Sequence, residues 1–171
     1  VKMNWKNTNV LVTGADGFIG SHIAKALVDK VSHVTTIVRD IKKISNLDIL
    51  KLRKGINIIN GDLINFHDCE RTINEYDIDF VFHIAAQAIV GPANRSPLST
   101  FESNIKGTWN ILETARHCPI KGIIIASSDK AYGDQPVIPY KENTPLSGMH
   151  PYDVSKSSAD LISQMYFKTY R

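Results

Sequence analysis

The stretch Thr13-Gly14-Ala15-Asp16-Gly17-Phe18-Ile19-Gly20 joins a short apolar run to a segment with helical spacing. Gly14 would make a tight turn, Gly17 would let the backbone approach a pyrophosphate, and Gly20 would let helix and strand pack closely. The N–H groups and the positive dipole end of the helix favour an anion. The stretch predicts a phosphate-binding turn, although an ordinary strand-to-helix turn would account for the glycines taken alone.

Around this turn, short apolar runs rich in β-branched residues alternate with amphipathic segments. The runs predict buried parallel strands, and the segments, where apolar residues return every three or four positions, predict helices. The expected strands are 9–13, 33–38, 56–60, 80–85 and 122–126, and the main helices are 19–30, 66–76, 98–117 and 151–171. This alternation predicts one α/β domain over 1–171, with a doubly wound, Rossmann-like parallel sheet.

Two segments, 91–97 and 133–148, are rich in turn residues and lack a periodic pattern. We expect both to be loops. Loops of this length in a compact domain are usually functional.

Composition excludes several classes of protein. The chain has 171 residues, 43% of them hydrophobic and 22% charged, which is typical of globular domains. Its net charge of +3 is spread along the sequence, so we expect no nucleic-acid partner. Cys69 and Cys118 form neither a metal-ligand pattern nor a disulfide framework, so we expect no metal and a reducing compartment.

The start of the chain, 1–14, holds one apolar run that is too short for a signal sequence or a membrane span. We therefore expect a soluble cytoplasmic protein without a membrane partner.

Arg39 and Asp40 stand about 20 positions after the glycine turn, where dinucleotide-binding folds usually carry an acidic residue. Asp40 could accept the adenosine 2′-hydroxyl of NAD. Arg39 could instead pair with the 2′-phosphate of NADP. A solvated ion pair is an equally good interpretation, so these two residues leave the choice of cofactor open.

Four more motifs follow the glycine turn in the order Gly61-Asp62-Leu63, His83-Ile84-Ala85-Ala86-Gln87, Asn104-Ile105-Lys106-Gly107 and Tyr152-Asp153-Val154-Ser155-Lys156. Together they resemble the TGxxGFIG, adenine-contacting Asp, HxAA, NxxGT and YxxxK motifs of the extended short-chain dehydrogenases. That family includes nucleotide-sugar 4-epimerases and 4,6-dehydratases. Alone, His83, Asp62 and Asn104 would be interpreted as a core histidine, a turn former and a helix-face amide. Their joint order favours the family.

The resemblance implies a bound nicotinamide dinucleotide and a nucleoside-diphosphate sugar as substrate. The residues it assigns to the cofactor are Gly14, Gly17, Phe18, Ile19, Gly20, Arg39, Asp40, Asp62, Leu63, Ala85, Ala86, Gln87, Asn104, Tyr152 and Lys156.

Tyr152 and Lys156 are four residues apart in a segment with helical spacing, so they share one helix face. A tyrosine hydroxyl is a poor base at neutral pH, and a nearby ammonium favours the phenolate. The resemblance implies that Tyr152 accepts the proton of a sugar hydroxyl while hydride leaves for the nicotinamide, and that Lys156 also holds the nicotinamide ribose.

Ser128-Asp129-Lys130 follows the fifth expected strand, at the sheet edge where α/β folds bind ligands. The segment resembles the Ser-Asp-Lys of the family's CDP-glucose 4,6-dehydratases, whereas epimerases carry small residues after the catalytic Ser or Thr. By this resemblance Ser128 bonds the sugar hydroxyl. Asp129 as acid and Lys130 as base would eliminate water across C5 and C6, provided that Asp129 is protonated and Lys130 neutral. A capping Asp and an exposed Lys are the plainer alternative.

The sequence therefore favours an NAD- or NADP-dependent 4,6-dehydratase over two rivals, a 4-epimerase and a non-catalytic dinucleotide-binding module. NAD is slightly favoured, because the reaction recycles its hydride internally. By resemblance we expect a homodimer formed through 98–117 and 151–171. The family places a substrate domain after the YxxxK helix, so we expect this chain to be an N-terminal fragment that binds dinucleotide weakly and turns over no sugar nucleotide alone.

Overall fold

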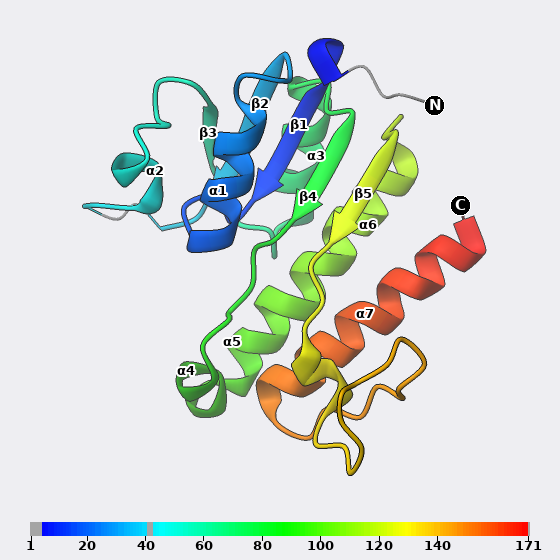
Figure 1. Cartoon of the computed structure of the whole chain (residues 1–171). Helices are drawn as coiled ribbons and strands as arrows, with labels where there is room; N and C mark the ends of the chain where they lie inside the picture. Colours follow the sequence, from blue (N-terminus) through cyan, green and yellow to red (C-terminus); the bar gives the residue numbers. More distant parts are fainter. Residues whose placement is uncertain (1–4, 41–42, 171) are drawn as a thin grey trace.

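The computed structural model describes residues 5–40 and 43–170. Five parallel strands form one sheet in the order β3-β2-β1-β4-β5, which confirms the predicted doubly wound α/β class (Figure 1). The strands are β1 (Asn9–Thr13), β2 (His33–Val38), β3 (Asn57–Asn60), β4 (Phe80–His83) and β5 (Gly122–Ile125). The last three are one or two residues shorter than the sequence pattern suggests.

Two hydrophobic clusters hold helices against the two faces of the sheet. On one face Val10 and Val12 of β1 pack with Ala24 of α1 (Phe18–Leu27), alongside the short α2 (Asn46–Ile49). On the other face Leu11 and Val81 pack with residues of α3 (Phe66–Glu75) and α6 (Gly107–His117). Successive strand residues point to opposite faces, so one run of apolar residues supplies both cores.

The helix expected over 98–117 consists of three contiguous segments. These are α5 (Pro97–Phe101), the five-residue π-helical turn η2 (Glu102–Lys106) and α6. π-Helical turns inside helices are frequent at functional sites. Beside this long helix lies α7 (Pro151–Tyr170), which also contacts the 3-10 turn η3 (Asp129–Tyr132) (Figure 1).

The prediction of a loop over 91–97 is wrong. Val90–Arg95 forms the short helix α4, and Pro97 begins α5. Pro92 lies in the first turn of α4, where its missing N–H has no intrahelical partner to lose.

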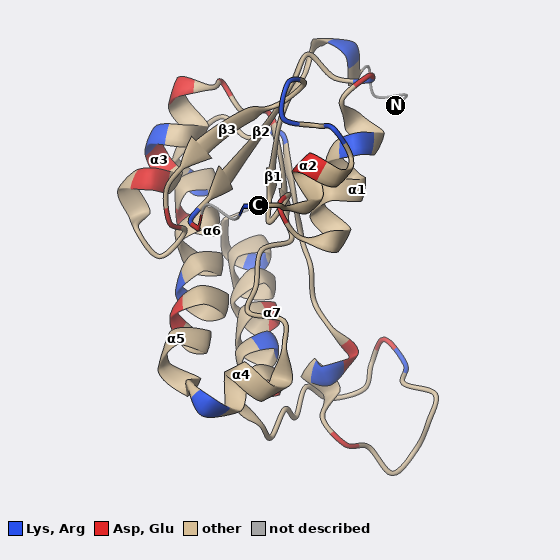
Figure 2. Ribbon diagram, turned by 90° about the vertical axis from the view of Figure 1, so that its left-hand side faces the viewer, with Lys and Arg blue, Asp and Glu red and all other residues tan. Residues whose placement is uncertain are grey.

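The loop over 133–148 is confirmed, and in Figure 2 it projects to one side of the helices. Its own side chains fold it back on itself. Ser147 Oγ donates to the Tyr132 carbonyl over 2.6 Å, and Gln135 Nε2 donates to the same carbonyl and to Ser147 Oγ.

Within the described residues, no helix is both long enough and apolar enough to span a membrane. Residues 1–4 of the N-terminal stretch, and Arg171 at the end of the helix expected over 151–171, lie outside the described part of the chain.

Candidate functional site

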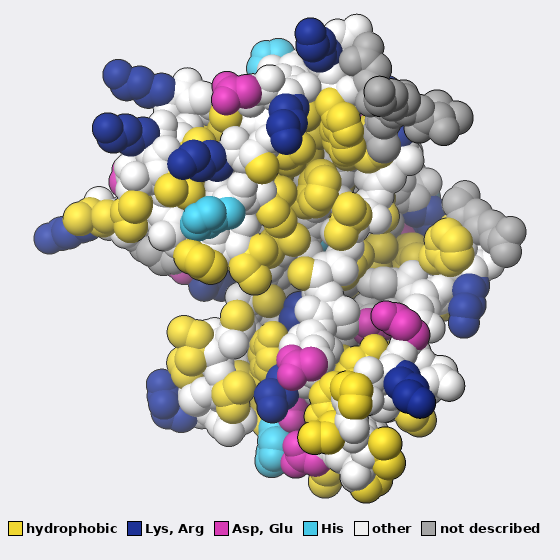
Figure 3. Space-filling model, viewed as in Figure 1, with side chains coloured by type: hydrophobic (Ala, Val, Ile, Leu, Met, Phe, Trp, Pro, Cys, Tyr) yellow, Lys and Arg dark blue, Asp and Glu magenta, His cyan; other side chains and the backbone are white. Residues whose placement is uncertain are grey.

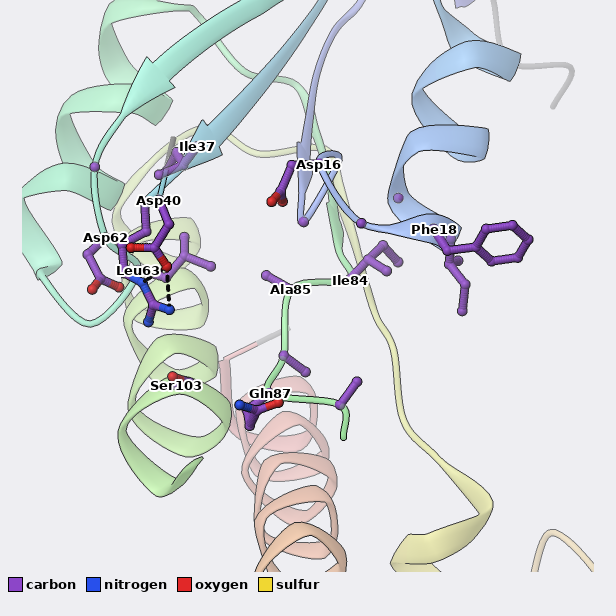
Figure 4. Close-up of a pocket in the computed structure, with 18 of the residues that line it drawn as sticks. Asp16, Phe18, Ile37, Asp40, Asp62, Leu63, Ile84, Ala85, Gln87 and Ser103 are labelled. Atoms are coloured by element: carbon purple, nitrogen blue, oxygen red, sulfur yellow. Dashed lines mark hydrogen bonds and ion pairs between the residues drawn. The ribbon is translucent and has the colours of Figure 1, made fainter. Parts of the chain in front are cut away.

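A cleft of about 530 Å³ lies at the carboxyl ends of β1, β2 and β4, a size typical of ligand sites. Figure 4 shows Asp40 and Asp62 on one side of it and Ala85 and Gln87 on the other, with Asp16 on the turn above Ala85 and the Phe18 ring turned away. The residues that the sequence assigned to the cofactor and that line the cleft are Gly14, Gly17, Phe18, Ile19, Gly20, Arg39, Asp40, Asp62, Leu63, Ala85, Ala86 and Gln87.

The glycine turn is too tightly packed for side chains. A Cβ on Gly20 would lie 2.2 Å from the Gly14 carbonyl oxygen, and a Cβ on Gly14, where φ is +72°, would lie 2.9 Å from the backbone of Ala85. Gly17 is the N-cap of α1, and among the described residues no side chain caps this helix. The turn therefore presents backbone and a helix N-terminus to the cleft, which is an arrangement suited to a pyrophosphate.

The end of the cleft away from the glycine turn carries the carboxylates of Asp40 and Asp62 and the guanidinium of Arg39 (Figure 4). Arg39 donates from Nε and Nη2 to the same oxygen of Asp40, over 2.9 and 2.8 Å. The hydrogen bond with Asp40, and the charges of Asp62 and Asp16, raise the pKa of Arg39. Among the described residues, two carboxylates and one guanidinium therefore meet at this end of the cleft.

His83, at the end of β4, is buried and joins three elements. Thr13 Oγ1 accepts the backbone N–H groups of Ile84 and Ala85 and lies 2.9 Å from His83 Nδ1. Its own proton must then go to Nδ1, so the imidazole is neutral with its hydrogen on Nε2, facing Thr108 Oγ1 at 3.1 Å. Burial, aided by the Lys156 charge, lowers the pKa of His83 to about 3, which agrees with a neutral ring.

Asn104, Tyr152 and Lys156 are not in the cleft lining. Asn104 lies behind it, on the π-helical turn. Its side-chain oxygen accepts the Gln87 N–H over 2.7 Å, and its Nδ2 donates to the Gln87 carbonyl and to Ser155 Oγ. Asn104 thus fixes the chain that forms one cleft wall and joins that wall to α7.

Tyr152 and Lys156 are both buried on the same face of α7, and Lys156 Nζ donates to the Ala126 carbonyl over 2.8 Å. Burial lowers the pKa of Lys156, and the nearby Asp160 carboxylate acts in the opposite direction. The lysine is therefore held at the point where the chain leaves β5.

Ser128 is the N-cap of η3, and its Oγ accepts the Lys130 N–H over 3.2 Å. Ser128 Oγ also donates to Asp129 over 3.2 Å. The side chains of Asp129 and Lys130 are exposed in this chain. Because η3 packs against α7, the structure brings this segment next to the helix that carries Tyr152 and Lys156.

Several residues that line the cleft were not predicted from the sequence, namely Asp16, Ile37, Gly61, Ile84, Ala88, Ser99 and Ser103. Most of them neighbour a predicted residue, so proximity to the motifs was the available indication. Ser103 directly precedes Asn104, whereas Ile37 and Ser99 neighbour no predicted residue and had no such indication.

The model of the GDP-mannose 4,6 dehydratase family matches residues 11–171. The chain belongs to the extended short-chain dehydrogenase family of epimerases and dehydratases. It is 32% identical to CDP-glucose 4,6-dehydratase of Salmonella typhimurium over 95% of this chain and 46% of that protein. It is also 32% identical to UDP-glucose 4-epimerase of Erwinia amylovora, over 94% of this chain and 49% of that protein.

Solved structures of an epimerase and of a dehydratase are both similar to this chain. UDP-glucose 4-epimerase of Thermotoga maritima has a TM-score of 0.85 at 28% identity, with 95% of this chain and 52% of that chain covered. A dTDP-glucose 4,6-dehydratase of Streptomyces venezuelae, determined with NAD bound, has a TM-score of 0.85 at 26% identity, with 95% of this chain and 52% of that chain covered. The chain spans about half the length of these family members, which include both epimerases and dehydratases.

Proposed function

We propose that this chain supplies the cofactor cleft and the catalytic residues of an NAD-dependent nucleotide-sugar 4,6-dehydratase. The product is a 4-keto-6-deoxy sugar, and the first substrate to test is CDP-glucose. The observation that carries the proposal is an acidic and a basic side chain, Asp129 and Lys130, directly after Ser128 at the exit of β5 and beside α7. Dehydration needs such a pair, whereas epimerisation at C4 does not.

The cleft fits a dinucleotide on its own geometry. A Cβ on Gly20 would collide with the backbone of the glycine turn, and the uncapped start of α1 offers N–H groups to a pyrophosphate. When bound, NAD would accept hydride from C4 of the sugar and return it to C6.

Each catalytic side chain has a defined task in this proposal. Tyr152 accepts the proton of the C4 hydroxyl, the Lys156 ammonium favours the phenolate and holds the ribose, and Ser128 hydrogen-bonds the same hydroxyl. Lys130 then takes the C5 proton while Asp129 gives a proton to the departing C6 hydroxyl, which leaves as water. Lys130 returns its proton to C5 when hydride is added at C6. Asp129 must start protonated and Lys130 neutral, which requires that the exposed segment be enclosed when substrate is bound.

The acidic end of the cleft favours NAD over NADP. The fork of Arg39 is engaged by Asp40, and Asp62 adds a second carboxylate at the same end of the cleft. A 2′-phosphate would meet this acidic surface. We expect NAD to bind more tightly than NADP. Asp40→Ser releases Arg39 and should reduce the ratio of the NADP and NAD dissociation constants by about tenfold, or roughly 1.4 kcal/mol. Equal dissociation constants in titration calorimetry of the unmodified chain would contradict this preference.

The product of the reaction tests the function. Because the chain spans 46% of the Salmonella relative, activity is assayed after fusion to the C-terminal part of that protein. With CDP-glucose we expect a 4-keto-6-deoxy sugar, detected by its near-ultraviolet absorbance in alkali. A 4-epimer as the only product would overturn the dehydratase assignment. The chain without the added part should bind NAD weakly and give no product.

Matched variants separate the steps. Asp129→Asn and Lys130→Met should abolish elimination while C4 oxidation continues, so that reduced nicotinamide accumulates. Asp134→Asn and Lys141→Met, exposed positions in the loop after η3, should leave turnover unchanged. Tyr152→Phe should stop oxidation itself.

A nucleotide-sugar 4-epimerase is the second candidate, because family members of both activities are equally similar in sequence. It would use Tyr152, Lys156 and Ser128 alone. A fusion protein that binds NAD but turns over neither substrate class would favour the third candidate, a non-catalytic binding module. We place the reaction in the cytoplasm, where free thiols such as those of Cys69 and Cys118 persist.

A further inference from the structure

Two side chains of α7 form hydrogen bonds with the chain where it leaves β5. Ala126 donates its N–H to the His83 carbonyl over 3.0 Å and accepts from Lys156 Nζ over 2.8 Å. The next residue, Ser127, donates from Oγ to Asp160 Oδ2 over 2.5 Å. Two consecutive residues at the strand exit are therefore bonded to two helix residues that lie one turn apart.

Tyr152, Lys156 and Asp160 follow at intervals of four along α7, so they lie on one face of the helix. Asp160 is partly buried, and its second oxygen accepts Gln164 Nε2 over 2.7 Å. A hydrogen bond from a hydroxyl to a carboxylate of this length is charge-assisted and stronger than a neutral one. It restrains the backbone immediately before Ser128, Asp129 and Lys130.

The same carboxylate acts on Lys156. Burial lowers the pKa of Lys156 and Asp160 raises it, while the neutral His83 faces the lysine from β4. The elements packed against α7 also carry Arg95 on α4, Glu102 and Lys106 on η2, Glu113 on α6, and Asp129, Lys130 and Tyr132 on η3. Among the described residues, Asp160 is the group whose charge has a resolved effect in favour of the Lys156 ammonium.

We infer that Asp160 is a positioning residue: through Ser127 it sets the direction in which the chain leaves β5 toward Ser128, and its charge balances the Lys156 ammonium. It touches neither substrate nor cofactor in this scheme. The inference rests on the proposed function only for the tasks of Ser128 and Lys156.

Three variants of the chain separate the two effects. Asp160→Asn removes the charge but keeps an acceptor for Ser127. Ser127→Ala removes the hydrogen bond but keeps the charge. Gln164→Ala removes the other partner of Asp160 and serves as the control. Circular dichroism establishes that each variant is folded.

The first measurement is the titration of Lys156 by NMR with isotope-labelled lysine, together with NAD affinity as a function of pH. In Asp160→Asn we expect Lys156 to lose its proton at a lower pH than in the unmodified chain, because the carboxylate charge that favours the ammonium is gone. The alkaline loss of NAD affinity should move by the same amount. In Ser127→Ala and Gln164→Ala, Lys156 should titrate as it does in the unmodified chain.

The second measurement is amide hydrogen exchange over 126–130. We expect faster exchange in Ser127→Ala than in Gln164→Ala. An unchanged Lys156 titration in Asp160→Asn, or equal exchange in the two other variants, would overturn the inference. Neither measurement uses a sugar nucleotide, so the product assay can fail without affecting this test, and the reverse also holds.

Discussion

His83 shows how a single buried residue couples the glycine turn to the helices behind the sheet. It is 3% exposed, and its two ring nitrogens face Thr13 and Thr108. Thr108 Oγ1 donates onward to the Asn104 carbonyl over 2.6 Å. Protonation would place a second cation beside Lys156 and leave Thr13 without an acceptor for its hydroxyl.

This arrangement predicts a stability that depends on pH. The unfolded chain protonates His83 near pH 6.5, whereas the folded chain does so only near pH 3. Between these values the unfolded state binds more protons, so the free energy of unfolding should fall as pH falls, by roughly 1.4 kcal/mol per pH unit from this group. Urea unfolding at several pH values measures this dependence of the unfolding free energy on pH.

The matched comparison uses two histidine variants. His83→Asn should make the acid slope of the unfolding free energy shallower between about pH 6 and pH 4. His22→Asn, at an exposed position on α1, should keep the slope of the unmodified chain. Equal slopes for all three proteins would mean that His83 is not the responsible group.

At the scale of elements, close backbone approaches fix the loops that border the cleft. Gly20 lets α1 begin directly over the turn that follows β1. Gly148 lets the loop before α7 pass close to the backbone of that helix, since a Cβ there would lie 2.4 Å from the carbonyl carbon of Asp153.

Gly20→Ala should damage folding and cofactor binding together. Its Cβ would meet backbone atoms of Gly14 at 2.2 and 2.6 Å, and backbone cannot move aside as a flexible side chain can. We expect a loss of about 2 kcal/mol or more in the free energy of unfolding, and no measurable NAD binding. Gly91→Ala is the control, because its nearest neighbour is the flexible end of Arg95 at 3.7 Å. Similar losses in both variants would contradict the argument.

Ser157 holds the 133–148 loop to α7. Its Oγ lies 2.7 Å from the Ala131 carbonyl, 3.0 Å from the Asp153 carbonyl and 3.2 Å from the Gly148 N–H. In Ser157→Ala we expect limited proteolysis to cut the loop several times faster. Ser163→Ala, which loses only a bond within the helix, should be cut at the original rate. No difference between the two would show that the loop is held by other contacts.

At the scale of the whole molecule, two apolar surfaces stand out. β5 is an edge strand, and Figure 3 shows hydrophobic side chains over the face where β4 and β5 lie. Ile124 on β5 is 55% exposed. A second set lies on the long helices, at Leu98, Trp109, Leu161, Met165, Phe167 and Tyr170. Surfaces of this kind favour association.

We propose that the helix surface forms a homodimer. The double substitution Leu161→Glu with Met165→Glu should raise the dissociation constant of the dimer by at least about tenfold, because each glutamate would bury a charge without a partner. Ile138→Glu, at a more exposed position in the loop, should leave the dimer intact. Sedimentation equilibrium measures both, and a monomeric unmodified chain at high concentration would refute the proposal.

The sequence by itself determined the strands, the glycine turn and the shared face of Tyr152 and Lys156, because each depends on residues close together in the chain. Glycine spacing and a four-residue interval have local geometric meaning. It also indicated most of the cleft lining, because parallel strands end at one edge of a sheet.

Only the tertiary structure decided which side chains meet across long separations. Ser127 and Asp160 are 33 residues apart, and Thr13 and His83 are 70 apart. No local pattern encodes such contacts. They exist because β1, β4 and β5 end side by side and α7 packs across the exit of β5. The same packing put Asn104 behind the cleft wall rather than in it, where its amide satisfies the backbone of Gln87.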